Sequence, residues 1–370
     1  MISNETEKFK CLGIMNGTSI DGADFVLVEI DKKNLSCRHL MTTSFSFPKQ
    51  LKARLVLAAT HKVYVDELAL LHHELGRYYA QCFKKLSSDF KEVLLIGLHG
   101  QTVFHRGAVA TLQIGEPSYL SVAANAIVVS DFRPADIALG GQGAPIATYF
   151  HVHNFGRKNN TISVHNLGGI SNLSLIKNNQ ILQGFDTGPA NMLIDLAVKI
   201  HTKNRKQFDK DGTLARSGSA DAKLIKKMLA HRFFKKRPPK SCGREEFGEV
   251  FYNQFRKDLH KLKINDRLAT LTAFVAQSIA DSYQKFCVEL PKEIIFCGGG
   301  ANNGFLLQKI SECLPGIVIK TTRDYGWPVE SVEGAAFAFL AAARGLSLNS
   351  NLPESTGASR GTSLGKVTQV

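Results

Sequence analysis

The sequence predicts an α/β protein built from two similar units. The first observation behind this prediction is an internal repeat: a strand–turn–strand–turn–strand meander followed by a helical segment occurs twice, starting near residues 11 and 161. The second is a set of short apolar runs bounded by turn residues, which is typical of buried strands. A chain of 370 residues is long enough for one large domain or two lobes.

The predicted elements follow in chain order. In the two meanders, the strands cover 11–15, 25–30, 161–166, 173–176 and 181–185, and the helices that follow cover 65–87 and 191–201. Further strands are predicted at 93–98, 126–130 and 293–297, and helices with apolar residues at helical spacing at 268–286 and 333–344. We expect lobe I to comprise 1–133 plus 345–370 and lobe II to comprise 134–344, with a link near 131–145 and a ligand cleft between them.

Composition narrows the class of protein. The formal net charge is +14, and basic residues crowd the stretch 223–240, where an amphipathic helix with a solvated basic face is expected. No nucleic-acid-binding motif accompanies this charge, although a basic protein attracts phosphorylated ligands.

Seven cysteines without a CxxC pair and an N-terminus without signal-peptide features predict reduced thiols and a cytoplasmic protein. The longest run of small apolar residues, 335–343, is too short to cross a bilayer.

A turn rich in glycine and hydroxyl groups follows the first strand. It reads Gly17-Thr18-Ser19-Ile20-Asp21-Gly22-Ala23-Asp24. Such turns present backbone N–H groups and hydroxyls in a concave cluster that binds phosphate oxygens. An ordinary hairpin turn is the alternative interpretation. The chain has no GxxxxGK[ST] motif, so a Walker-type phosphate loop is excluded.

Polar motifs also stand at the ends of the other predicted strands, where open α/β sheets collect their active sites. They are His99-Gly100-Gln101-Thr102, Asp131-Phe132-Arg133 with Gly140-Gly141-Gln142-Gly143, Asp186-Thr187-Gly188-Pro189 and Gly298-Gly299-Gly300-Ala301-Asn302. Each has a plain alternative: a core histidine for His99, an ion pair between Asp131 and Arg133, a helix cap for Asp186, and a packed helix start for the glycines. Taken together, they predict a two-lobed phosphotransferase.

These motifs resemble the anhydro-N-acetylmuramic acid kinase family. Besides the turn and the strand ends, the resemblance rests on Gly168-Gly169-Ile170, Gly243-Arg244-Glu245 and the tail Thr356-Gly357-Ala358, all in the family's order from about residue 11 onward. The resemblance implies an actin/hexokinase/Hsp70-type fold, with two RNase H-like lobes around an ATP-binding cleft. It also implies the activity: water opens the anhydro bridge of 1,6-anhydro-N-acetylmuramic acid, and the freed O6 takes the γ-phosphoryl group of ATP, in cell-wall recycling.

The chain departs from the family pattern at four places. Asn16 stands where the family usually has Ser, Ala190 where it has Gly, and Gly334 where it has Ala, while the Pro usual after His105 is missing. None of these changes removes a charged or catalytic group.

The resemblance also implies roles for individual residues. Asp186 is expected to be the base that activates water, with Glu333 as the second catalytic candidate. ATP is expected to contact the turn 17–24, with Asp21 holding Mg²⁺ or its waters, and the glycine-rich residues of the second meander and of the 298–302 loop: Gly168, Gly169, Gly298, Gly299, Gly300 and Asn302. The sugar is expected at His99, Gln101, Thr102, Asp131, Arg133, Gly188 and Pro189.

Two rival functions stay open at this point. One is a kinase for another anhydro sugar, such as levoglucosan. The other is a nucleotide-dependent binding or chaperone-like module with the same fold and no sugar substrate. For the kinase we expect small-molecule partners (ATP, sugar and water), no nucleic acid and no membrane, and we leave a homodimer open.

Overall fold

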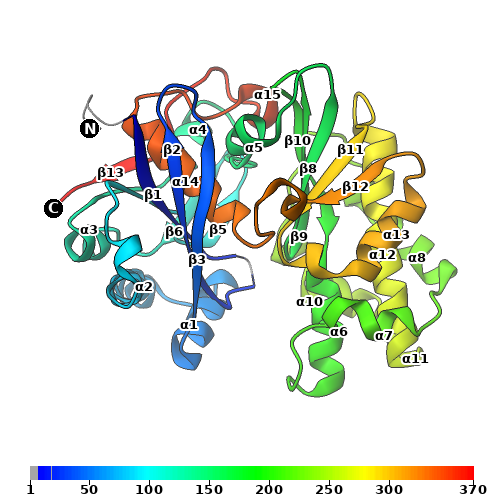
Figure 1. Cartoon of the computed structure of the whole chain (residues 1–370). Helices are drawn as coiled ribbons and strands as arrows, with labels where there is room; N and C mark the ends of the chain where they lie inside the picture. Colours follow the sequence, from blue (N-terminus) through cyan, green and yellow to red (C-terminus); the bar gives the residue numbers. More distant parts are fainter. Residues whose placement is uncertain (1–6, 18) are drawn as a thin grey trace. The chain divides into compact units, whose positions relative to one another are not determined.

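The computed structural model describes residues 7–17 and 19–370, and these form two compact units. Unit 1 comprises the described residues up to Phe155 together with Ser331–Val370, and unit 2 comprises Gly156–Glu330 (Figure 1). Each unit has its own hydrophobic core, because one cluster of buried apolar side chains lies within unit 1 and another lies within unit 2.

Unit 1 is organised around a six-stranded sheet in the order β13-β7-β4-β1-β2-β3. Its strands are β1 (Lys8–Met15), β2 (Gly22–Asp31), β3 (Cys37–Ser46), β4 (Leu95–Leu98), β7 (Ile127–Ser130) and β13 (Lys366–Thr368). The first three form an antiparallel meander, β4 and β7 add in parallel, and β13 closes the edge antiparallel to β7. A separate hairpin consists of β5 (Gln101–Arg106) and β6 (Ala110–Ile114).

Unit 1 also contains several helices. They are α1 (Lys49–Ala59), α2 (Val65–Lys84), α3 (Ser118–Ala124), α4 (Pro134–Ala138), α5 (Thr148–Phe155), α14 (Val332–Gly345) and α15 (Pro353–Thr356), with a short 3₁₀ helix η1 (Ser88–Phe90). Figure 1 shows α14 against the strands of this sheet, and α14 packs on β1, β2 and β4. α2 packs its buried face, which includes Leu71, Leu75 and Tyr79, into the unit 1 core.

Unit 2 repeats the same strand order, β10-β9-β8-β11-β12. Its strands are β8 (Thr161–Leu167), β9 (Ile170–Lys177), β10 (Gln180–Pro189), β11 (Glu293–Cys297) and β12 (Val318–Thr321). β8, β9 and β10 form the antiparallel meander, and β11 and β12 add in parallel. The repeated order confirms the predicted fold class, two RNase H-like α/β lobes.

Most of the unit 2 helices pack on one long central helix, α12. The α-helices are α6 (Asn191–Thr202), α7 (Thr213–Arg216), α8 (Ala222–Leu229), α9 (Arg244–Phe247), α10 (Glu249–Gln254), α11 (Arg256–Lys261), α12 (Ile264–Phe286) and α13 (Gly304–Cys313). The 3₁₀ helices are η2 (Lys210–Gly212), η3 (Arg232–Lys235), η4 (Gly299–Asn302) and η5 (Thr322–Tyr325). α12 contacts α6, α7, α8, α13 and β10. Within the described residues, no helix is both long and apolar enough to span a membrane.

The expected lobe boundaries differ from the units observed. The segments 134–155 and 331–344, expected in lobe II, belong to unit 1, and the expected link at 131–145 lies inside that unit. The physical reason is close packing of α14, because a Cβ on Gly13 would lie 1.8 Å from the Gly334 carbonyl oxygen. Likewise, a Cβ on Gly97 would lie 2.0 Å from the Phe337 carbonyl oxygen. Sequence periodicity does not reveal which sheet a buried helix covers.

We predict that Gly13→Ala lowers the free energy of unfolding by roughly 2 kcal/mol or more, because backbone cannot move aside as a side chain can. Gly361→Ala is the matched control, since its new Cβ would meet only the Asn349 side chain, at 3.2 Å. Chemical denaturation of both variants measures the difference. Equal stability of the two variants would contradict the proposed packing of α14.

Candidate functional site

The turn after β1 has an unusual backbone. The Ile20 N–H donates to the Gly17 carbonyl at 3.2 Å, and Ile20 has a φ of 55°. A β-branched residue rarely adopts this left-handed conformation, and strain of this kind concentrates at functional sites. Ser19 and Asp21 are exposed, whereas Thr18 lies outside the described residues. The described residues of the turn thus place the polar side chains of Ser19 and Asp21 on the surface.

The turn is shorter than the sequence predicted. Gly22, Ala23 and Asp24 lie in β2, not in the turn. Gly22 allows close packing, because a Cβ there would lie 2.3 Å from the Phe45 carbonyl oxygen, and the Asp24 carboxylate accepts a hydrogen bond from Ser44. The Asp21 carboxylate forms an ion pair with Lys52 of α1 through Oδ1.

The motif at the end of β4 joins a buried polar network. Nε2 of His99 lies 3.0 Å from the Arg133 guanidinium, which also donates to the Gly143 carbonyl at 2.8 Å. The Gly143 N–H in turn donates to Asp136, whose carboxylate also accepts from Asn351 and Thr356. Burial, and next the Arg133 charge, lower the pKa of His99 well below its usual value. The His99 imidazole is therefore neutral, with Nε2 as the acceptor and Nδ1 as the donor.

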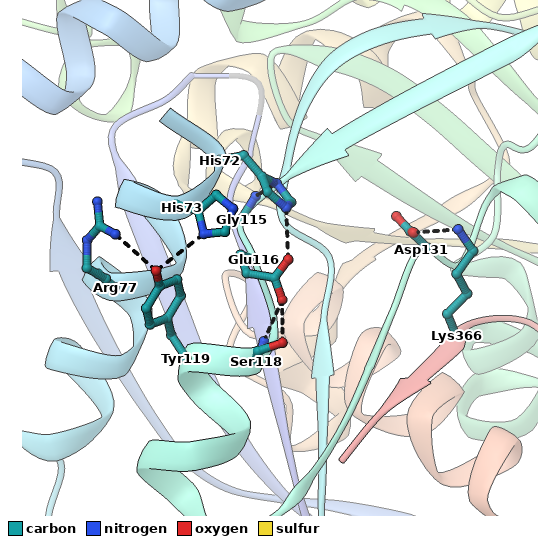
Figure 2. Close-up of polar contacts among 9 residues, drawn as sticks. All are labelled: His72, His73, Arg77, Gly115, Glu116, Ser118, Tyr119, Asp131 and Lys366. Atoms are coloured by element: carbon teal, nitrogen blue, oxygen red, sulfur yellow. Dashed lines mark hydrogen bonds and ion pairs between the residues drawn. The ribbon is translucent and has the colours of Figure 1, made fainter. Parts of the chain in front are cut away.

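Asp131 and Arg133 take different partners. The Asp131 carboxylate pairs with Lys366 of β13 at 3.0 Å (Figure 2), while Arg133 bonds to His99 and Gly143. Asp131 thus links the end of β7 to the neighbouring strand β13.

Three buried side chains near the β5–β6 hairpin carry polar atoms without a hydrogen-bond partner among the described residues. They are Nδ1 of His99, Oε1 of Gln101 and Oε1 of Gln113, and each residue is at least 93% buried. Thr102, on the same hairpin, accepts from Gln113 at 3.2 Å. An unsatisfied buried polar group costs about 1–3 kcal/mol, so such a cluster needs an explanation. A hydroxyl-rich ligand with both donors and acceptors would supply one.

The segment after β6 is tied to helix α2. A ring nitrogen of His72 lies 3.1 Å from the Glu116 carboxylate, which also accepts from the Ser118 backbone and hydroxyl (Figure 2). The Gly115 N–H donates to the other ring nitrogen of His72. These contacts hold the end of the strand that carries Gln113 in place.

In unit 2, the turn at Gly168 and Gly169 is fastened to the start of α6. The Asn191 N–H donates to the Gly168 carbonyl at 3.1 Å, and the Ala190 N–H donates to the Gly169 carbonyl at 2.9 Å. The Asn191 side chain donates to the Leu167 carbonyl at 3.1 Å. These hydrogen bonds fix the turn relative to the first residues of α6.

The three glycines after β11 have different environments. A Cβ on Gly298 would lie 2.3 Å from Oδ1 of Asn166, and one on Gly300 would lie 2.7 Å from Cβ of Leu167, so both positions allow close packing on the end of β8. Gly299 is exposed, and its Cβ would meet nothing within 4 Å. The glycines open the short 3₁₀ helix η4 instead of a long helix, and exposed Asn302 accepts from Arg323.

Asp186 lies within β10, near its carboxyl end, because this strand continues to Pro189 instead of ending at 185. Its N–H donates to the Lys240 carbonyl at 3.1 Å, and its Oδ2 accepts from the Cys242 N–H at 2.9 Å. The N-cap residue of helix α6 is Ala190. Asp186 does not cap this helix, so the helix-cap interpretation of Asp186 is wrong. The strand pairing with β9 shifts register between Asp186 and Gly188, and Gly188 has a φ of 135°.

Glu333 lies in the first turn of α14 and is half-buried. It therefore belongs to unit 1, whereas Asp186 belongs to unit 2. Four residues further along α14, the Phe337 ring lies 4.5 Å from the His99 ring, centroid to centroid. Within unit 1, α14 thus connects the region of Glu333 to the end of β4.

Sequence reasoning did not single out three residues that contribute to these sites. Gln113 could have been found as a polar residue in an otherwise apolar strand segment, Leu112-Gln113-Ile114. The contacts of Lys240 and Cys242 with Asp186 come from their backbone, and backbone contacts leave no signal in residue type.

Comparison with known proteins places these features in a family. The family described as anhydro-N-acetylmuramic acid kinase matches residues 9–370. The anhydro-N-acetylmuramic acid kinase of Trichormus variabilis is 36% identical over 380 residues, which cover 97% of each chain. That of Thiobacillus denitrificans is 39% identical over 372 residues, which cover 99% of this chain and 98% of the relative.

Solved structures resemble the chain more distantly. An activator of 2-hydroxyisocaproyl-CoA dehydratase from Clostridium difficile with bound ADPNP is 10% identical, with a TM-score of 0.46 and coverage of 90% of this chain and 94% of that one. A ROK family glucokinase from Streptomyces griseus in complex with glucose and AMPPNP is 11% identical, with a TM-score of 0.38 and coverage of 90% and 99%.

The family match spans nearly the whole chain, and relatives with more than 30% identity align over nearly the full length of both sequences. The chain belongs to the anhydro-N-acetylmuramic acid kinase family.

Proposed function

We propose that this protein uses ATP and water to convert 1,6-anhydro-N-acetylmuramic acid to N-acetylmuramic acid 6-phosphate and ADP. Water attacks the anomeric carbon, the bond from that carbon to the bridging oxygen breaks, and the freed O6 takes the γ-phosphoryl group. The family match over residues 9–370 carries this proposal. The reaction belongs to cell-wall recycling and amino-sugar breakdown, for which we propose a cytoplasmic location.

Asp186 is the proposed general base. A base must reach the water with a free lone pair and a fixed orientation. The Cys242 N–H donates to Oδ2 and so restricts the orientation of the carboxylate. Gly188 and Pro189, next along β10, are proposed to contact the sugar, with Glu333 of α14 as the second catalytic group.

ATP is proposed to bind its phosphates at the turn from Gly17 to Asp21, with further contacts from Gly168, Gly169 and the 298–302 loop. Mg²⁺ binds proteins through one or two carboxylates, with water and phosphate oxygens completing its shell. Asp21 fits such a role, because it is exposed beside the turn and its ion pair with Lys52 uses only Oδ1. The ion would neutralise charge on the transferring phosphoryl group.

The sugar is proposed to contact His99, Gln101, Thr102 and Arg133. The unsatisfied atoms of His99 and Gln101 are one donor and one acceptor, which suits the hydroxyl and amide groups of an amino sugar. The Asp131 carboxylate already pairs with Lys366, so Arg133 is the better candidate for contact with the sugar.

We predict that ADP release depends on the sugar and is at least tenfold faster with 1,6-anhydro-N-acetylmuramic acid than with levoglucosan. Levoglucosan lacks the acetamido and lactyl groups, and a site built to hydrogen-bond such groups discriminates strongly against their loss. A coupled ADP assay with each sugar and with none provides the measurement. Faster turnover of levoglucosan would favour the rival kinase, and sugar-independent ATP hydrolysis would favour the binding module.

Asp186→Asn is predicted to lower kcat by about 10²–10⁴, because the amide keeps the shape of the side chain but cannot accept the proton. Its melting temperature should stay close to that of the wild type. Asp258→Asn is the matched control, since the Asp258 carboxylate pairs with Lys227 in the α8–α11 region, away from β10. Near-normal activity of Asp186→Asn would make Glu333 the first candidate for the base.

Gly299→Asp is predicted to weaken ATP binding more than Gly299→Asn does. Both side chains enter open space, so the two variants differ in charge and not in packing. At 4 Å in water, two like charges repel by about 1 kcal/mol, and by more near a protein surface, which corresponds to fivefold or more in affinity. Calorimetry with a non-hydrolysable ATP analogue measures both constants, and equal affinities would place the nucleotide phosphates elsewhere.

A further inference from the structure

Lys240 is a buried lysine with an unusual environment. Its residue surface is 7% exposed, and its Nζ has no hydrogen-bond partner among the described residues. Nζ lies instead near three aromatic rings, 4.2 Å from the centroid of Phe286, 4.7 Å from Phe233 and 5.7 Å from Phe185. An ammonium among ring faces gains attraction from each ring, and this attraction is strongest when water is excluded.

Some of the groups around Lys240 raise the pKa of its ammonium and others lower it. Burial lowers the pKa of its ammonium to about 8, Cys242 and Asp186 oppose this decrease, and Lys236 and Lys285 add to it. The group is therefore charged below about pH 8 and loses its charge as the pH rises through that value. Phe286 is the last residue of α12, and a cation at a helix C-terminus is also favoured by the helix dipole.

The backbone beside Lys240 holds Asp186 at two points. The Lys240 carbonyl accepts from the Asp186 N–H at 3.1 Å, and the Cys242 N–H donates to the Asp186 carboxylate at 2.9 Å. β10 is an edge strand whose sheet partner is β9, and its pairing is irregular at Asp186. The segment 240–242 thus supports the outer side of β10 at the residue proposed as the base.

We infer that Lys240 is a positioning residue for Asp186: its ammonium, held among Phe286, Phe233 and Phe185, anchors the segment whose backbone orients the Asp186 carboxylate. This inference rests on the proposed function, in which Asp186 activates water. Without the Lys240 ammonium among the rings, the 240–242 segment can shift. The Asp186 carboxylate is then no longer held in a single orientation. Misplacement of a catalytic group by about 1 Å can cost 10²-fold in rate.

Lys240→Met provides the test, because methionine keeps an unbranched apolar chain that fits between the rings but carries no charge. Lys235→Met is the matched control, since Lys235 is exposed on the preceding 3₁₀ helix. At pH 7 we expect kcat of Lys240→Met to fall about tenfold or more, with the KM for ATP within about twofold of the wild type. The control should match the wild type in both constants.

The pH profile separates positioning from a loss of stability. In the wild type and in Lys235→Met, kcat is expected to fall as the pH rises through about 8, where the Lys240 ammonium loses its charge. In Lys240→Met this decrease in kcat at alkaline pH, the alkaline limb of the profile, is expected to be absent. A wild-type profile that is flat from pH 7 to 9.5, or an unchanged limb in Lys240→Met, overturns the inference.

The double variant separates this inference from the proposed function. If Lys240 acts through Asp186, Lys240→Met lowers kcat in the wild-type background and has no further effect in the Asp186→Asn background. If Lys240→Met lowers kcat by the same factor in the wild-type and Asp186→Asn backgrounds, the positioning role is overturned. If instead Asp186→Asn alone is nearly as active as the wild type, the proposed base is wrong, and the positioning of that base is overturned with it.

Discussion

The close approach of α14 to the centre of the sheet is the constraint on which unit 1 depends. Gly13 and Gly97 lie on the two central strands, and each touches backbone of α14 so closely that no side chain fits. This contact brings Phe337 against the rings of His99 and Phe132 at the ends of β4 and β7. The polar residues at those strand ends, and Glu333 one turn earlier on the helix, are therefore held by one packing interface.

Unit 2 positions its site differently, through buried hydrogen bonds. The Thr187 hydroxyl donates to Ser171, Ser171 bonds to Nε2 of His165, and Nδ1 of His165 bonds to Tyr283 of α12, at 2.6, 2.6 and 2.9 Å. Burial lowers the pKa of His165 to about 3, so this network stays neutral at physiological pH. Together with the 240–242 segment on its outer side, the network holds β10 from two directions next to Asp186.

The sequence predicted much of this architecture, because buried apolar runs and the turns that bound them are local patterns. The repeated meander, the strands at β4, β7 and β11 and the long helices α12 and α14 were all predicted, with boundaries within a few residues. The assignment of α14 to a unit could not be predicted, since its contact with Gly13 joins residues more than 300 positions apart. The same limit applies to Asp186, because the contacts it makes with Lys240 and Cys242 involve backbone atoms of a loop about 55 residues away.

Two of the four departures from the family pattern, Asn16 and Gly334, have local physical explanations. Asn16, where Ser is usual, donates to the hydroxyl of buried Tyr79 at 2.5 Å and so links the end of β1 to α2. Nothing in the structure explains Ala190, where Gly is usual, because its φ of −116° and ψ of −109° lie outside the main regions allowed to a residue with a Cβ. Gly334, where Ala is usual, faces Val26, whose Cγ2 would lie 2.4 Å from an added Cβ. The small residue on α14 and the branched one on β2 therefore complement each other, and this pair preserves the helix–sheet distance on which the site of unit 1 depends.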